Sequence, residues 1–120
     1  PTSVAVDRND NIYVADCHHH AIRLITPSGQ VTTIAGNGTF GYRDGHGTSA
    51  SFAQPSSLVL IPGDPRHVDT LGDSRDDDGV SEKYPMGNPG DPRLMIADSV
   101  NARIGMLNLR TGRVRTLNGT

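Results

Sequence analysis

The chain has 120 residues and a formal net charge of −2, so its overall electrostatics favour neither nucleic acid nor an acidic membrane surface. No apolar run approaches the roughly 18–20 residues that a membrane-spanning helix needs. Hydrophobic residues make up 34% of the chain and aromatic residues 4%, which is low for a domain that builds its own core. The one cysteine, Cys17, has no second cysteine for an internal disulfide bond, so cysteine usage indicates neither an oxidising nor a reducing compartment.

Residues 1–36 contain four short apolar segments separated by turn residues. Val, Ile, Thr and Tyr dominate the segments, and Gly, Asn, Asp, Pro and Ser fill the gaps. This composition predicts four short β-strands joined by tight turns. The predicted strands lie within Pro1–Val6, Ile12–Ala15, Ile22–Ile25 and Val31–Ile34.

The same pattern returns in residues 55–119. Arg93–Asp98 (RLMIAD) repeats Asn11–Asp16 (NIYVAD), and both copies end in Ala-Asp. Four strands per unit, at a spacing of roughly 40–50 residues, are typical of a β-propeller blade, which is a four-stranded antiparallel sheet. The sequence therefore predicts an all-β fold with one blade at 1–36, a connector at 37–54 and a second blade at 55–119. The matched structural positions of the two units are Asp16 and Asp98, Ile22 and Ile104, and Gly29 and Gly112.

The second unit is interrupted by an insertion at 63–90, where the first unit has only a tight turn. The insertion holds seven acidic and three basic side chains and has almost no apolar periodicity. Such a composition predicts a disordered or loosely ordered loop. Because the entropy of loop closure grows slowly with length, a stacked sheet tolerates such an insertion. We expect the insertion to add a contact that is specific to one partner.

Both units resemble the NHL repeat, whose pattern is approximately Pro-x-Gly-Val-Ala-Val-Asp, Asn-Ile/Leu-Tyr-Val-Ala-Asp and Thr-x-Asn-His-Arg-Ile-Arg. The matching residues are Asp7, Asn11–Asp16, His20, Ile22 and Arg23 in the first unit, and Asp98, Asn101, Arg103 and Ile104 in the second. Gly105 stands where the family usually has Arg. The connector is similar to the blade-to-blade connector of one NHL subgroup. The resemblance implies a six-bladed NHL/TolB-like ring, of which this chain is two blades and the remaining blades belong to the same protein.

Aspartates and histidines are the candidate site residues of the two blades. A carboxylate at Asp16 or Asp98 can accept hydrogen bonds from backbone N–H groups of the following turn. Because this residue recurs in each blade whereas a ring has one active site, we assign it a structural role. His18, His19 and His20 could ligate zinc or copper. Successive side chains on an extended strand point to opposite faces, so a solvated turn is the preferred interpretation.

The insertion contains a run of carboxylates, Asp76, Asp77 and Asp78, that faintly resembles a calcium loop. The EF-hand pattern fails here, because Ser74 takes the first ligand position and Pro85 falls where a glutamate is required. We therefore predict only weak, nonspecific attraction of cations to this run, and neither a metal site nor a cofactor for the chain.

Arginines make the second unit modestly basic, and some NHL propellers bind RNA through a basic face. The candidates for contacts with RNA or a partner are Arg23, Arg103, Arg113 and Arg115. They lie on different strands and turns without an aromatic platform, which favours a charged and solvated sheet edge.

The function that the sequence favours is a non-catalytic scaffold for macromolecular recognition, mainly of protein, through inter-strand loops on one propeller face. Two alternatives stay open. A propeller enzyme of the lyase or lactonase type would need a central metal with ligands from several blades. An RNA-binding propeller would need a contiguous basic face across blades and an affinity that falls steeply with salt.

Overall fold

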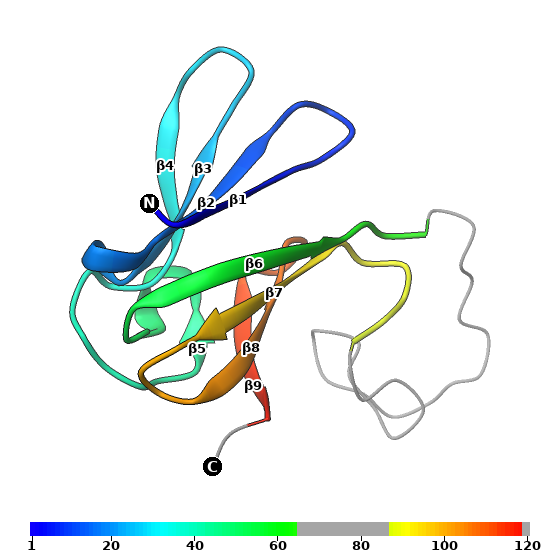
Figure 1. The fold of residues 1–120 in the computed structure, drawn as a ribbon. Coiled ribbons are helices and arrows are strands. Elements are labelled where there is room, and N and C mark those ends of the chain that lie inside the picture. The colour runs from blue at the N-terminus through cyan, green and yellow to red at the C-terminus, as the bar shows by residue number, and fades with distance from the viewer. Residues whose placement is uncertain (65–86, 119–120) are drawn as a thin grey trace.

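The computed structural model describes residues 1–64 and 87–118, and within them the protein forms two antiparallel sheets (Figure 1). The all-β class predicted from the sequence is confirmed. Most of the predicted insertion, including Asp76, Asp77 and Asp78, lies outside the described residues, so the predictions for that segment stay predictions.

The first sheet contains four strands in the order β1-β2-β3-β4. They are β1 (Ser3–Val6), β2 (Ile12–Asp16), β3 (Ala21–Ile25) and β4 (Val31–Ala35). A short 3₁₀ turn, Cys17–His19, joins β2 to β3. The strands end at the predicted turns because those turns need left-handed backbone, which Gly29 adopts before β4 with a φ of 89°.

The second sheet contains five strands in the order β5-β9-β8-β7-β6. They are β5 (Gly45–His46), β6 (Pro55–Ile61), β7 (Arg93–Asp98), β8 (Arg103–Asn108) and β9 (Arg113–Asn118). The prediction of a four-stranded second blade is wrong by one strand, because the connector folds back and pairs with β9. The Gly47 N–H fixes this return by donating to the Gly112 carbonyl at 2.7 Å, beside a second 3₁₀ turn, Gly47–Ser49.

The hydrophobic core lies between the two sheets and is centred on a residue of the connector. Phe52 is fully buried and packs with Ile22 of the first sheet and with Leu94, Ile96 and Leu107 of the second. Strands β1 and β6 lie side by side (Figure 1), and the Leu58 N–H of β6 donates to Ser3 Oγ of β1, while Thr2, just before β1, donates to the Ser56 carbonyl. The connector therefore belongs to the core, rather than only joining two units.

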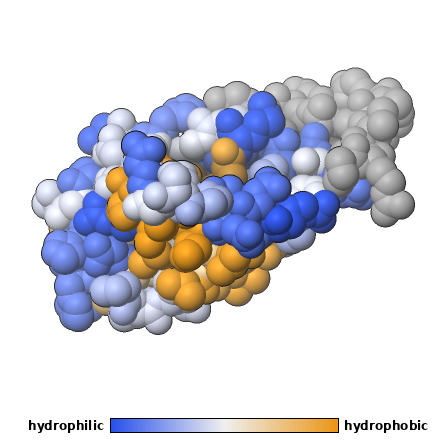
Figure 2. Space-filling view, turned by 90° about the horizontal axis from the view of Figure 1, so that it is seen from above, coloured by the Kyte–Doolittle hydropathy of each residue, from blue (hydrophilic) through white to orange (hydrophobic). Residues whose placement is uncertain are grey.

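Each sheet also has an outward face, turned away from this core. Ile22 and Ile104 occupy equivalent register positions, opposite Ala15 and Ala97, yet Ile22 is buried and Ile104 is 39% exposed. The difference arises because Ile22 faces the second sheet, whereas Ile104 lies with exposed Val59 on the outward face. Figure 2 shows apolar side chains gathered into one patch, bordered by hydrophilic residues.

The helical elements of the described residues are two 3₁₀ turns of three residues each, and neither is long enough to cross a membrane.

Candidate functional site

The inter-strand segments gather at two ends of the sheets. The connector end consists of the turns 17–20 and 99–102 and the parts of the connector 36–54 that contact them, whereas Gly47 of the connector reaches the turn 109–112 at the other end. The hairpin end consists of the turns 7–11, 26–30 and 109–112, together with the two chain segments that lead into the insertion.

Asp98 is fully buried and ties the connector end together. Its Oδ1 accepts a hydrogen bond from the Ala53 N–H, and its Oδ2 accepts from Asn101 Nδ2 and Arg103 Nε, each at 2.7 Å. Asn101 Nδ2 also donates to the Gly41 carbonyl at 2.8 Å. One carboxylate thereby fixes the turn after β7 to two separate parts of the connector.

Arg103 pairs with this carboxylate, and its side chain is fully buried. Its Nη1 donates to Asp44 Oδ1 at 2.8 Å and to Thr116 Oγ1 at 3.0 Å, and its Nη2 donates to the Ser51 carbonyl at 2.5 Å. Five N–H donors in a fixed plane suit this arrangement of acceptors. The prediction that Arg103 contacts RNA or a partner is wrong, because the guanidinium is used inside the protein.

Aromatic rings enclose the same guanidinium. The carbon of the Arg103 guanidinium lies 4.4 Å from the centroid of the Tyr42 ring and 5.4 Å from that of Phe52. These distances are within the range of cation–π attraction. Tyr42 is 54% exposed, so one face of its ring packs against the Arg103 guanidinium while the rest of the ring contacts solvent.

The first sheet places its arginine differently. Asp16 pairs in register with Ala21, whereas Asp98 pairs with Arg103. Arg23, two residues further along β3, supplies the guanidinium and donates from Nε to Asp16 Oδ2 at 3.1 Å. The two units thus build the same type of ion pair from two different strand positions.

The hydrogen-bond donors to the two aspartates differ from those predicted. The described turn after Asp16 makes no backbone capping bond to its side chain, and the His20 N–H donates to the Cys17 carbonyl. Burial acts to raise the pKa of Asp16, but hydrogen bonds and charges from His19 and Arg23 outweigh it and lower the pKa below its ordinary value. Asp98 receives its backbone bond from the connector. The prediction of backbone N–H donors from the following turn is therefore wrong for both residues, and the turns instead contribute the side chains of His19 and Asn101.

The three consecutive histidines diverge. His18 is exposed, His19 Nδ1 lies 2.9 Å from Asp16 Oδ1, and His20 Nδ1 accepts a hydrogen bond from the Gln54 N–H at 3.1 Å. The His20 ring meets Phe40 edge-on, with 5.4 Å between centroids. Within residues 1–64 and 87–118, no group of three His, Cys, Asp or Glu side chains is placed to hold a metal ion.

Large apolar side chains are exposed at the connector end. Phe40 is 56% exposed, Tyr42 54% and Val100 51%. The three residues, which we call the connector patch, belong to two segments joined by the Asn101 bond to Gly41 and by the Val100 N–H bond to the Ala53 carbonyl at 3.1 Å. The patch is therefore carried on backbone that the Asp98 and Arg103 network holds in place.

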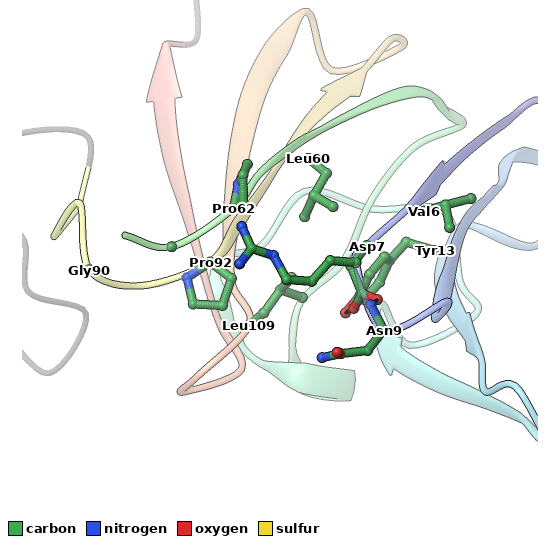
Figure 3. A pocket seen from close by; sticks show the side chains of 11 residues that line it. Val6, Asp7, Asn9, Tyr13, Leu60, Pro62, Gly90, Pro92 and Leu109 are labelled. Carbon is green, nitrogen blue, oxygen red and sulfur yellow. Dashed lines mark hydrogen bonds between the residues drawn. The ribbon is translucent and has the colours of Figure 1, made fainter. Parts of the chain in front are cut away.

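The hairpin end contains a cleft of about 600 Å³ between the sheets (Figure 3). Val6, Asp7, Asn9 and Tyr13 lie on the side of the first sheet, and Leu60, Pro62, Pro92 and Leu109 on the side of the second. Arg8 also lines the cleft, and Gly63 and Gly90 form its rim beside the insertion.

Asp7 is the most highly coordinated side chain of the cleft. Its Oδ1 accepts from the N–H groups of Asn9 and Asn11, at 2.8 and 3.0 Å, and its Oδ2 accepts from Asn11 Nδ2 and the Tyr13 hydroxyl, each at 3.0 Å. Burial acts to raise the pKa of Asp7, but these bonds outweigh it and hold the pKa below its usual value. Burial, with the hydrogen bond and charge of Asp7, raises the pKa of Tyr13 to about 12.

The remaining candidate arginines lie apart. Arg23 is half-buried against Asp16, and Arg113 and Arg115 lie on β9 of the other sheet. Because Arg103 is buried and Arg23 belongs to the other sheet, these side chains do not form one contiguous basic face. Sequence reasoning missed the connector patch and the cleft. The aromatic residues Phe40 and Tyr42, placed two apart in a Gly-rich segment, are the signal that could have revealed the patch.

Residues 1–23 match the NHL repeat family, so the chain contains an NHL repeat and the resemblance seen in the sequence is confirmed over these residues. The chain is 25% identical to the protein SUPPRESSOR OF QUENCHING 1, chloroplastic, of Arabidopsis thaliana, in an alignment covering 92% of this chain. The chain spans 13% of the length of that relative.

Two solved structures share the fold. An auxiliary nutrient binding protein from Bacteroides ovatus aligns with a TM-score of 0.63, and one from Bacteroides thetaiotaomicron aligns with a TM-score of 0.61. Each is 17% identical in sequence and matches 94% of this chain, which spans 24% of the solved chain. The arrangement of two antiparallel sheets is therefore propeller-like.

Proposed function

We propose that this chain is a non-catalytic recognition module of the propeller type and that its partner is a protein. The observation that carries the proposal is the connector patch, in which Phe40, Tyr42 and Val100 are each more than half exposed. Aromatic side chains on rigid backbone are the typical anchors of protein interfaces, because they bury a large area with little loss of conformational entropy. The neighbouring structures are named as binding proteins, which agrees with recognition rather than catalysis.

The exposed outward faces support the finer architectural proposal that the two sheets are consecutive blades of a six-bladed ring. Val59 is 60% exposed on the second sheet, and Val4 is 61% exposed on the first. Stacked blades bury such faces against their neighbours. A structure of a longer protein containing this chain tests this proposal, and a ring of another blade number would contradict it.

The test of partner recognition is affinity purification from the source cells, followed by identification of the captured proteins. We expect the wild-type chain to retain at least one partner that the double variant Phe40→Ala/Tyr42→Ala loses. Val31→Ala is the matched control, because it removes an apolar side chain that is 60% exposed on β4, outside the patch. Retention of every partner by the double variant would overturn the assignment of the patch.

No observation on residues 1–64 and 87–118 favours the enzyme or RNA alternatives. The candidate arginine Arg103 is buried, and the described His, Cys, Asp and Glu side chains do not gather in threes.

A further inference from the structure

The walls of the cleft at the hairpin end are held by contacts between the two described ends of the insertion. Gly63 and Gly90 meet so closely that a Cβ on Gly63 would lie 2.5 Å from the Gly90 carbonyl oxygen. The Asp64 N–H donates to the Pro89 carbonyl at 2.9 Å, and the Leu109 N–H donates to the Pro92 carbonyl at 2.9 Å. These contacts hold the two prolines of the cleft, Pro62 and Pro92, on stiff and closely paired backbone.

The lining is apolar over most of its area. Leu60, Pro62, Pro92 and Leu109 form one side, and the Tyr13 ring and Val6 form the other (Figure 3). A volume of about 600 Å³ falls within the roughly 300–1,000 Å³ of small-molecule sites. The cleft therefore has the size and the walls to enclose a small apolar body.

The polar side chains of the cleft differ in how many hydrogen-bonding positions they leave available to a ligand. A carboxylate has about four acceptor positions, and Asp7 uses four of them for Asn9, Asn11 and Tyr13. A cationic ligand would therefore find no vacant acceptor on Asp7. By contrast, within the described part of the chain, no hydrogen bond or ion pair engages the guanidinium of Arg8 or the side-chain amide of Asn9.

We propose that this cleft binds a small carboxylate with an apolar body, its carboxylate paired with Arg8 and its carbon skeleton packed between Tyr13 and the Leu60 and Leu109 side chains. Arg8 supplies planar N–H donors that match a carboxylate in pairs. Asn9 adds an amide donor to the lining of the same cleft. The carboxylate belongs either to a free organic acid or to the C-terminal residue of a peptide. This site lies at the opposite end from the connector patch. A failed test of ligand binding in the cleft would therefore leave the proposed protein recognition unaffected.

The test uses four small probes with one aromatic body, followed by isothermal titration calorimetry and by NMR shifts of the protein. The probes are 3-phenylpropionate for a free acid, N-acetylphenylalanine for a peptide end, neutral 3-phenylpropionamide, and cationic 3-phenylpropylamine. We expect one or both carboxylates to bind more tightly than the amide and the amine, with shifts at Tyr13, Leu60 and Leu109. Which carboxylate binds better identifies the source of the ligand. Raising the salt concentration should weaken binding, because the ion pair is partly solvated.

Arg8→Gln should weaken carboxylate binding about tenfold while leaving the weak binding of the amide unchanged. Arg43→Gln is the matched control, since it removes the same charge from an exposed arginine at the connector end and should change nothing. Stronger binding of the amine, equal binding of all four probes, or equal loss in both variants would each overturn the proposal. Absence of binding by either carboxylate at millimolar concentration would overturn it as well.

Discussion

At the residue scale, Asp98 and Arg103 form an ion pair in which both side chains are fully buried. A charge left without its partner in the interior destabilises a protein strongly, whereas an exposed pair contributes little. The chain offers a contrast, since the Arg110 side chain is 55% exposed and donates to Asp91 at 2.9 Å, while the Asp91 carboxylate also accepts from Asn108 Nδ2.

Arg103→Met should lower the free energy of unfolding by about 3–5 kcal/mol, because it leaves the carboxylate of Asp98 buried. Arg103→Lys should recover only part of this loss, since an ammonium group cannot span the same acceptors. Arg110→Met should lower it by less than Arg103→Met, because the Arg110 side chain is half exposed and Asp91 keeps its bond from Asn108. Urea unfolding measures all three variants. Equal losses at positions 103 and 110 would contradict the assigned role of Arg103.

Substitutions at two glycines can distinguish the cost of a left-handed φ from the cost of a steric clash. Gly29 and Gly36 both have left-handed φ, at 89° and 92°, but a Cβ would meet nothing within 4 Å at Gly29 and would lie 2.5 Å from the His20 carbonyl oxygen at Gly36. Gly29→Ala should therefore destabilise by about 1–2 kcal/mol, from φ alone. Gly36→Ala should destabilise by clearly more, because the connector must also shift. Similar thermal midpoints for the two variants would show that the connector yields freely.

Protonation of Asp7 should account for part of the stability that the folded chain loses at low pH. Its pKa in the folded protein lies below its ordinary value, so its stabilising contribution is complete above about pH 4 and is lost as the pH falls through the folded pKa. Asp7→Asn should therefore lower stability at pH 7, and its difference from wild type should shrink below pH 4. Urea midpoints at pH 7, 4 and 3 provide the measurement.

Asp10→Asn is the control, because the Asp10 side chain lies exposed in the same turn. It should leave stability at pH 7 within about 0.5 kcal/mol of wild type. A wild-type advantage over Asp7→Asn that grows toward pH 3 would contradict the assignment.

At the scale of the element, β5 depends on a side chain outside the strand. Asp44 accepts hydrogen bonds from the Thr116 N–H at 3.0 Å, from Thr116 Oγ1 at 2.7 Å and from Arg103 Nη1 at 2.8 Å. These bonds hold a strand of two residues against β9. Asp44→Ala should raise the amide exchange rates of Gly45 and His46 on the order of tenfold, from the loss of charge-assisted bonds.

The exchange rates of β1 and β2 provide an internal control, because these strands belong to the first sheet and Asp44 is bonded to β8 and β9 of the second. Acceleration across both sheets would mean that the variant loosens the whole protein, and unchanged rates in β5 would mean that Asp44 does not hold it.

The elements also show what a sequence can predict. The strands of both sheets were foreseeable, because turn residues such as Gly29 and Gly112 separate clear apolar runs. Strand β5 was not, since two residues carry no periodicity and their pairing with β9 is a long-range contact. The role of Arg103 was hidden because the pairing arginine of the first unit stands two positions later. The cleft was hidden because its walls come from segments far apart in the chain.

At the scale of the whole molecule, the outward face of the second sheet should govern association. An exposed apolar patch of this kind favours contact between molecules. We expect the 120-residue chain to self-associate as its concentration rises, and Val59→Asp to suppress this association while leaving the fold intact. Sedimentation velocity measures both. A monomeric wild type at all concentrations would contradict the expectation.

The contact between Gly63 and Gly90 has a practical consequence for protein engineering. The chain leaves the second sheet and returns to it through a closed neck, so we expect β6 and β7 to keep their register when the sequence between residues 64 and 89 is changed. Because loop closure depends weakly on length, a foreign sequence of very different length can replace that stretch at small thermodynamic expense. The neck is therefore a natural graft point, where an epitope, a reporter or a second binding loop can be displayed beside the cleft.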